Sequence, residues 1–158
     1  MSANIVLARI DDRLVHGQIM TAWVQYTSAN HIVIVDNVTA KDDFVKSIIE
    51  MAVPKSIGLS ITDEEGAPDL LNTLHESKRA IILAKIPQAF LELIKKNVLF
   101  KEINIGGMGA KKERAKFYKN ISASEEEKKA FREIIDFGVA LNIQILPYDA
   151  AIPAKDFL

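Results

Sequence analysis

The sequence predicts an α/β protein: an open, doubly wound, mostly parallel sheet of six or seven strands, with helices on both faces and a single domain covering residues 1–158. Three observations support this fold. Short runs of Ile, Val and Leu alternate with longer segments of helical period along nearly the whole chain. Most of these runs lack polar alternation, as expected for parallel strands that are covered on both faces. The length of 158 residues suits one hydrophobic core, and no linker or repeat interrupts the pattern.

Six aliphatic segments are predicted to be strands, because Ile, Val and Leu dominate them. These segments are Asn4–Ile10, His31–Val35, Ile57–Ile61, Ala80–Ala84, Glu102–Ile105 and Leu141–Leu146. In the last one, every second residue is apolar, which is typical of an edge strand and leaves room for an antiparallel direction. Residues 106–120 (GGMGAKKERAKFYKN) are predicted to form a loop, with space for a short extra strand near Tyr118–Ile121.

Two helices are predicted in the first third of the chain. One is expected to begin near Gln18, and its apolar residues recur on one face at Ile19, Trp23 and Tyr26. The other is expected to follow Thr39 and Asp42, which together read as a capping box. The apolar stripe of this second helix comprises Phe44, Val45, Ile48 and Ile49.

Two later helices carry clearer start and stop signals. Pro87 suits the first position of a helix, and core-facing residues follow it at Phe90, Leu91 and Ile94. Ser124 and Glu127 form a capping box for the last helix, which Gly138 is expected to end. The residues of this helix that are expected to face inward are Phe131, Ile134 and Ile135.

Composition excludes several classes of function. The net charge of −1 provides no field that would hold nucleic acid or an anionic membrane, so no nucleic-acid partner is expected. The absence of cysteine excludes disulfides, thiolate metal sites and thiol nucleophiles. No apolar run approaches the roughly 18 residues needed to span a bilayer, and the start MSANIVLARIDDR lacks the pattern of a signal peptide. A cytoplasmic location is therefore expected.

Three histidines, His16, His31 and His75, are the only side chains that titrate near neutral pH without a special environment. Their spacing matches no metal-binding motif, so neither a metal ion nor a cofactor is expected. His31 starts an apolar strand and His75 lies in a polar helix end, which favours structural or solvated roles for both.

The segment after the first predicted strand concentrates reactive groups. It places Asp11, Asp12, Arg13, His16 and Gly17 at the carboxyl end of a strand, where open α/β sheets bind their ligands. A neutral imidazole can attack phosphorus, and a guanidinium can neutralise phosphoryl oxygens. The glycine permits close backbone approach, and the start of the following helix offers unpaired N–H groups. A carboxylate can fix which imidazole nitrogen carries the proton. These residues therefore predict an anion or phosphoryl site.

The same residues also allow a purely structural interpretation. A lone histidine in a loop is more often a surface or supporting residue than a nucleophile. Asp11 and Asp12 could cap the following turn, with Arg13 paired to them at the surface. The residues by themselves thus leave the activity open.

The stretch Ala8–Gln18 (ARIDDRLVHGQ) closely resembles the active-site signature of a bacterial protein family. That family is the IIB component of the mannose/fructose/sorbose class of the phosphoenolpyruvate-dependent sugar phosphotransferase system. The resemblance continues in Asn104–Met108 (NIGGM) and in Asn120–Ser124 (NISAS), and the chain length also agrees. It therefore covers essentially the whole sequence.

The resemblance implies a phosphoryl carrier rather than an enzyme that acts alone. In this family the loop histidine, here His16, accepts phosphoryl on Nδ1 from a phosphohistidine of a IIA protein or domain. It then passes the group to a sugar that enters through the IIC/IID membrane permease. Arg13 matches the family arginine associated with the phosphoryl group. The family implies peripheral association with the permease, does not identify the sugar, and leaves a homodimer open.

Several other residues are secondary candidates. Asp36 follows the second predicted strand and either lies beside the first loop or caps the next helix, the latter being favoured. Gly106 and Gly107 either admit a phosphoryl group or partner backbone to the site or form a tight turn. Lys111 and Lys112 belong to a basic stretch that is either a solvated loop or a docking surface for a partner.

Two rival functions remain at this stage. One is a non-catalytic α/β module that binds a sugar phosphate or a nucleotide and signals through a partner. The other is a degenerate relative that serves only as a scaffold, which the presence of both Arg13 and His16 disfavours. Phosphate on His16 that is labile in acid and stable in base would distinguish the carrier from the binding module.

Overall fold

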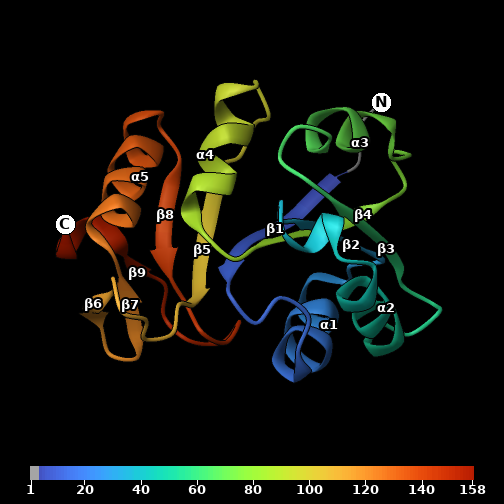
Figure 1. Ribbon diagram of the computed structural model, residues 1–158, viewed down its shortest axis with the longest axis horizontal. Helices are drawn as coiled ribbons and strands as arrows, with labels where there is room; N and C mark the ends of the chain where they lie inside the picture. Colours follow the sequence, from blue (N-terminus) through green and yellow to red (C-terminus); the bar gives the residue numbers. More distant parts are fainter. Residues whose placement is uncertain (1–3) are drawn as a thin grey trace.

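The computed structural model describes residues 4–158 and has the predicted open α/β fold (Figure 1). Its main sheet has seven strands in the order β3-β2-β4-β1-β5-β8-β9. All neighbouring pairs are parallel except β8 with β9. The strands are β1 (Asn4–Asp11), β2 (His31–Val35), β3 (Gly58–Thr62), β4 (Arg79–Ala84), β5 (Glu102–Gly107), β8 (Ala140–Ile143) and β9 (Ile152–Pro153).

Helices cover both faces of the sheet, as the sequence predicts. They are α1 (Val24–Thr27), which continues a π-helical turn at Ile19–Trp23, and α2 (Asp43–Ala52), α3 (Ala67–Thr73), α4 (Pro87–Lys95) and α5 (Glu125–Asp136). One hydrophobic cluster joins the sheet to the first two helices, and a second cluster joins the opposite face to the other three. Within residues 4–158 no helix is both long and apolar enough to cross a membrane.

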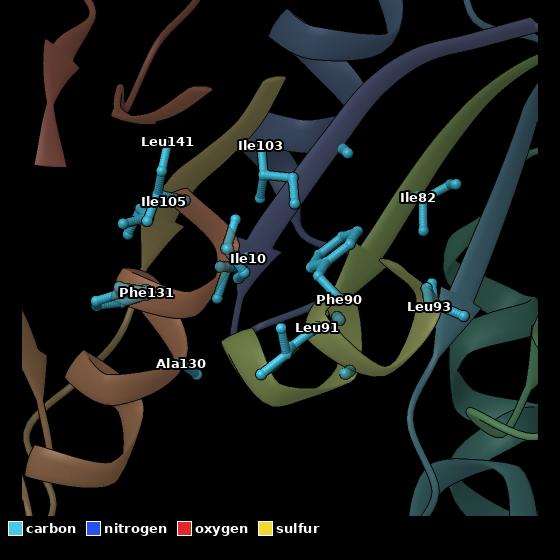
Figure 2. Close-up of a cluster of buried hydrophobic side chains, with 14 of the residues drawn as sticks. Ile10, Ile82, Phe90, Leu91, Leu93, Ile103, Ile105, Ala130, Phe131 and Leu141 are labelled. Atoms are coloured by element: carbon cyan, nitrogen blue, oxygen red, sulfur yellow. The ribbon is translucent and has the colours of Figure 1, made fainter. Parts of the chain in front are cut away.

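The larger hydrophobic cluster, which lies between the sheet and α3, α4 and α5, packs against the strands next to the loop that follows β1. Figure 2 shows Phe90 and Leu91 of α4 and Phe131 of α5 turned toward aliphatic side chains of β1, β5 and β8. Among those partners, Ile10 and Ile105 are completely buried. Burying such side chains contributes about 1.5–3 kcal/mol each. The carboxyl ends of β1 and β5 are therefore held by a rigid core.

Helix boundaries follow the predicted caps in the second half of the chain. Pro87 occupies the first position of α4 after Ile86. Ser124 and Glu127 form a reciprocal capping box at the start of α5. Gly138 lies just beyond the end of α5 with φ of +88°, a conformation that glycine adopts without strain. The predictions for both helices are confirmed.

The prediction for α2 is wrong in two respects. Asp42 alone caps the helix by accepting from the Val45 N–H, whereas the Thr39 hydroxyl donates to Asp36 across a short 3-10 turn. Thr39 and Asp42 therefore form no capping box. Of the predicted stripe, Phe44 and Ile48 are exposed, because only one narrow side of α2 meets the sheet. Tyr26 of α1 is likewise mostly exposed.

The strand predicted at Leu141–Leu146 is shorter and differently placed. β8 ends at Ile143, runs parallel to β5, and is not an edge strand because the antiparallel β9 pairs with its outer side. Residues beyond Ile143 leave the sheet to form a turn. Near Tyr118–Ile121 the structure has a hairpin of β6 (Ala115–Tyr118) and β7 (Ile121–Ala123), with its turn at the centre of the predicted segment.

Candidate functional site

The loop that leaves β1 is held in shape by its own backbone and by Leu14. The Leu14 N–H donates to the Asp11 carbonyl at 3.0 Å, which closes a turn. Leu14 has φ of +56°, an unfavourable conformation for a side chain of this size. Its side chain is buried in the cluster under α1, and this burial offsets the backbone strain. The loop is therefore anchored at its centre.

Asp11 and His16 form the central contact of the site. Asp11 Oδ2 lies 2.9 Å from His16 Nε2; the carboxylate is completely buried, and 16% of the imidazole side chain is exposed. An ionised carboxylate can only accept a hydrogen bond, so the imidazole proton lies on Nε2. The lone pair of the neutral imidazole is then on Nδ1. Nε2 is therefore used in the hydrogen bond to Asp11, and the lone pair of Nδ1 is left available for reaction.

Arg13 makes a two-pronged contact with the same carboxylate. Its Nε lies 3.0 Å from Asp11 Oδ1 and its Nη2 lies 2.9 Å from Asp11 Oδ2. The hydrogen bond to Asp11 raises the pKa of Arg13. Nearly half of the Arg13 side chain, 46%, is exposed. The guanidinium is therefore both permanently charged and accessible to an incoming anion.

Burial of the Asp11 carboxylate opposes its ionisation, but the hydrogen bonds from Arg13 and His16 outweigh this effect. The pKa of Asp11 is consequently lowered below its ordinary value. Asp11 is an anion at neutral pH and remains a hydrogen-bond acceptor for the imidazole.

The imidazole also lies at the start of a helix. The His16 carbonyl accepts from the Met20 N–H, and helical structure begins at Gly17. The first N–H groups of a helix lack partners within it and carry partial positive charge. No heavy atom lies within 4 Å of the point where a side chain of Gly17 would begin. The approach to this end of the helix is therefore open.

Asp12 contacts a different element from Asp11. Its Oδ2 accepts from the Gly109 N–H at 2.8 Å and from Arg114 Nη1 at 3.0 Å. Arg114 also makes two hydrogen bonds of 2.8 Å to Glu127, the partner of Ser124 in the capping box of α5. The sequence left the roles of Asp11 and Asp12 open. In the structure Asp11 contacts the imidazole, while Asp12 ties the first loop to the segment 109–114.

The two predicted glycines make space for the site's own side chains. Gly106 and Gly107 are the last residues of β5, so the alternative that they form a tight turn is wrong. A side chain at Gly106 would overlap the guanidinium of Arg9, and one at Gly107 would begin 2.5 Å from Asp11 Oδ1. Only glycine permits these buried polar groups to lie against β5.

Sequence reasoning missed a role for Arg9. This residue is fully buried and donates to Asp11 Oδ2 at 3.4 Å, to the Asn104 side chain, and to the carbonyls of Gln144 and Ile145. Burial lowers its pKa to about 10, so it stays protonated at neutral pH. The available signal was an arginine inside the apolar run NIVLARI, since a charged residue in a buried strand needs dedicated partners.

The remaining candidates lie outside this contact network. Asp36 accepts hydrogen bonds from the N–H and the hydroxyl of Thr39 in the 3-10 turn and lies 3.7 Å from Lys85. Because Asp42 caps α2, the prediction that Asp36 caps the next helix is wrong. His31 is buried against Ser60. Lys111 and Lys112 are exposed in the loop that Asp12 and Arg114 anchor. Across residues 4–158, no cluster of three or more His, Asp or Glu side chains is arranged to hold a metal ion.

The site is an open loop rather than an enclosed pocket. A cavity of about 820 Å³ lies over the amino-terminal half of β1, between α3 and the segment 96–102, and no residue of the loop 11–18 lines it. The guanidinium of Arg13 is instead nearly half exposed, and 16% of the His16 side chain is exposed. This arrangement fits a reactant that is presented by another macromolecule.

Comparisons with known proteins find relatives in sequence and solved structures of the same fold. Residues 5–158 match the family model described as "PTS system sorbose subfamily IIB component". The fructose-specific EIIB component of Bacillus subtilis (strain 168) is 36% identical over 156 residues, covering 98% of this chain and 94% of that protein. The crystal structure of the IIBSor domain of the Klebsiella pneumoniae sorbose permease superposes with a TM-score of 0.89 at 27% identity, covering 97% and 94% of the two chains. The mannose-specific EIIAB component of Escherichia coli (strain K12) is 26% identical over 98% of this chain and 48% of its own length.

Proposed function

Because this chain belongs to the sorbose subfamily of IIB components of the PTS sugar-transport system, we propose that His16 is the residue on which it carries phosphoryl between two partners. IIB components are phosphotransferases, so the family defines the reaction class. The proposal concerns the residue, the nitrogen and the order of transfer.

The observation that carries the proposal is the 2.9 Å contact between Asp11 Oδ2 and His16 Nε2. This contact places the proton on Nε2 and leaves the lone pair of Nδ1 available for attack. Nδ1 belongs to a side chain at a helix start, beside a guanidinium that is 46% exposed. Both features favour a phosphoryl group with its negative oxygens.

In the accepting step, the Nδ1 lone pair of His16 attacks the phosphorus of a phosphohistidine on a IIA partner. A P–N bond to Nδ1 forms, and the P–N bond of the donor breaks. The electron pair of the broken bond returns to the donor ring nitrogen. His16 keeps its Nε2 proton, so its ring gains positive charge, which the ionised Asp11 stabilises.

In the donating step, a hydroxyl oxygen of the sugar in the IIC/IID permease attacks the same phosphorus. The P–N bond of His16 breaks, its electron pair returns to Nδ1, and the hydroxyl proton passes to a base of the permease. Arg13 releases Asp11 and follows the phosphoryl oxygens in both steps. Because one P–N bond replaces another in the first step, the protein contributes positioning and charge stabilisation rather than a large driving force.

The test is transfer of radiolabelled phosphoryl from phosphoenolpyruvate, with the general enzymes and a IIA partner present. We expect the wild type to acquire acid-labile, base-stable phosphate, located at His16 by mass spectrometry under conditions that preserve phosphohistidine. His16→Ala should fold normally and remain unlabelled. His75→Ala is the matched control, because the His75 side chain is exposed and hydrogen-bonds to nearby Ser77, so this variant should be labelled like the wild type.

Labelling of His16→Ala at the wild-type rate would refute the proposal. Absence of label on the wild type, together with tight binding of a sugar phosphate or nucleotide, would indicate the non-catalytic binding module instead.

A further inference from the structure

The Asp11 carboxylate has two guanidinium partners that differ in exposure. Arg13 is 46% exposed, whereas Arg9 is completely buried. Both donate to Oδ2, the oxygen that also binds His16 Nε2. A phosphoryl group on Nδ1 would compete with Asp11 for the exposed guanidinium. The buried guanidinium has no such route to the phosphoryl group, so it stays with Asp11 throughout the reaction.

From this division of roles, which rests on the proposed function, we infer that Arg9 is a positioning residue: it holds Asp11 in the orientation that fixes the proton of His16 on Nε2 and thereby selects Nδ1 for phosphoryl transfer. Arg9 itself does not touch the reacting nitrogen in this arrangement. It acts on His16 only through the carboxylate.

Arg9 is held on all sides, as a positioning residue must be. Its Nη1 lies 2.7 Å from the Gln144 carbonyl and also bonds to the Asn104 side chain, while its Nη2 lies 3.0 Å from the Ile145 carbonyl. The guanidinium carbon lies 5.0 Å from the centre of the Trp23 ring, and Trp23 Nε1 donates to that same Ile145 carbonyl. These contacts leave the Nε–H directed at Asp11.

The turn after β8 supplies two of these acceptors and is itself braced. Gln144 accepts from Asn104 and donates to the carbonyls of Pro147 and Asp149. The side chain of Asp149 closes the turn by accepting from the Leu146 N–H. Gly106 provides the space that the guanidinium occupies. A chain of rigid contacts thus runs from the last turn of the sheet through Arg9 and Asp11 to the imidazole.

A purely structural role for Arg9 would consist of joining β1 to residues 144 and 145. Such a role and the positioning role both predict some loss of stability when Arg9 is replaced. They differ in what happens to the histidine. Only the positioning role predicts a change in the tautomer of His16 and in the nitrogen that becomes phosphorylated.

The experiment compares the wild type with Arg9→Lys and Arg9→Met by NMR of ¹⁵N-labelled histidine and by ³¹P NMR after labelling through the relay. The lysine keeps a positive charge but lacks the planar fork that reaches Asp11 and the carbonyls together. We expect the wild type to hold the proton on Nε2 and to carry phosphoryl on Nδ1 alone. Arg9→Lys should show a mixed tautomer, a share of phosphoryl on Nε2, and a rate of acceptance lower by about 10- to 100-fold, by analogy with residues that orient metal-binding histidines through a hydrogen bond.

If Arg9→Met fails to fold, Arg9→Lys and Trp23→Phe carry the test. Trp23→Phe removes the N–H donor to the Ile145 carbonyl but leaves Asp11 untouched, and we expect a smaller shift of tautomer in the same direction. A folded Arg9→Lys variant with the wild-type tautomer and phosphoryl on Nδ1 alone would overturn the inference while leaving the carrier function intact. A wild type that carries no phosphoryl on His16 would instead refute the proposed function.

Discussion

Asp11 Oδ2 lies 2.9 Å from His16 Nε2, although five positions separate the two residues and the carboxylate is completely buried. The buried carboxylate remains an anion because hydrogen bonds from Arg13 and His16 outweigh the effect of burial, and Arg9 also donates to it. The proton on Nε2 therefore follows from the electrostatics of the strand end. This relationship makes Asp11 the first residue to vary after the histidine itself.

Asp11→Asn should impair phosphoryl acceptance strongly. An amide can offer N–H as well as oxygen to the imidazole, so the fixed proton position is lost, and the charge that stabilises the phosphorylated ring disappears. By analogy with catalytic triads, we expect a loss on the order of 10²- to 10⁴-fold in the rate of acceptance, measured with labelled phosphoryl donor.

Asp12→Asn is the matched control for Asp11→Asn. It removes the same charge from the adjacent residue, but Asp12 contacts Arg114 and Gly109 rather than His16. We expect a much smaller loss of rate for this variant. Equal losses in the two variants would show that the net charge of the loop matters rather than the contact with the imidazole.

Glu127 should make the stability of the protein sensitive to acid. Burial opposes its ionisation, but hydrogen bonds from Arg114 and the Ser124 backbone outweigh that effect and lower its pKa. A group with a lowered folded pKa stabilises the fold above its unfolded pKa, and this contribution is lost as the pH falls through the folded pKa. Glu127→Gln should therefore unfold more easily at pH 7 and show a flatter decline of stability below about pH 4.5.

The measurement is the free energy of unfolding in urea as a function of pH. Glu125→Gln is the control, because Glu125 lies two residues away in the same first turn and its side chain is 85% exposed. Its pH profile should match that of the wild type. A wild-type profile for Glu127→Gln would mean that the contact with Arg114 contributes nothing to acid sensitivity.

The sequence predicts much of the fold because strand positions depend on local aliphatic runs. β2 begins and ends at the predicted residues, since His31–Val35 is buried along its whole length. Contacts between residues far apart in the sequence determine the rest of the fold. β8 ends at Ile143, and the next two carbonyls bind the guanidinium of Arg9, which is 135 and 136 positions away in the sequence. The pattern of apolar residues within 141–146 gives no sign of this contact with Arg9.

The same limit applies to the site. The residue types in the loop 11–18 predict a phosphoryl site, but not the separate contacts of Asp11 and Asp12. Asp11 is the last residue of β1 and its carboxylate is buried, whereas Asp12 lies in the turn that follows and its carboxylate reaches Arg114. The role of Gly106 and Gly107 was also not predictable from the local sequence, because they make space for Arg9 and Asp11 of the neighbouring strand β1.

Gly106→Ala should destabilise the protein. Its added methyl group would overlap the Arg9 guanidinium, which is held by buried partners and cannot move aside freely. Overpacking of this kind typically costs about 1–3 kcal/mol. Gly17→Ala is the control in urea unfolding, because its added methyl group meets no atom within 4 Å. We expect that variant to be as stable as the wild type, and equal stability of both variants would contradict the assigned role of Gly106.

Lys111 and Lys112 provide the last prediction, which concerns the docking of the phosphoryl donor. They are exposed, and the turn from Lys111 to Arg114 is closed by a backbone hydrogen bond of 3.0 Å. Arg114 and Gly109 bind Asp12, so this basic turn is fixed beside the loop that carries His16. Exposed lysines so placed should attract an anionic partner over a distance set by ionic strength.

The variant Lys111→Ser/Lys112→Ser should therefore accept phosphoryl more slowly at low salt, and its rate should depend less on salt than that of the wild type. Charge steering acts on association, so the maximal rate at saturating donor should be retained. The variant Lys95→Ser/Lys96→Ser is the control, because it removes the same charge from exposed residues at the end of α4. That end of α4 leads into the amino end of β5, whereas Asp11 pairs with the carboxyl end of β5. Equal slowing in both double variants would assign the effect to net charge, whereas slowing confined to the first locates the docking surface beside His16.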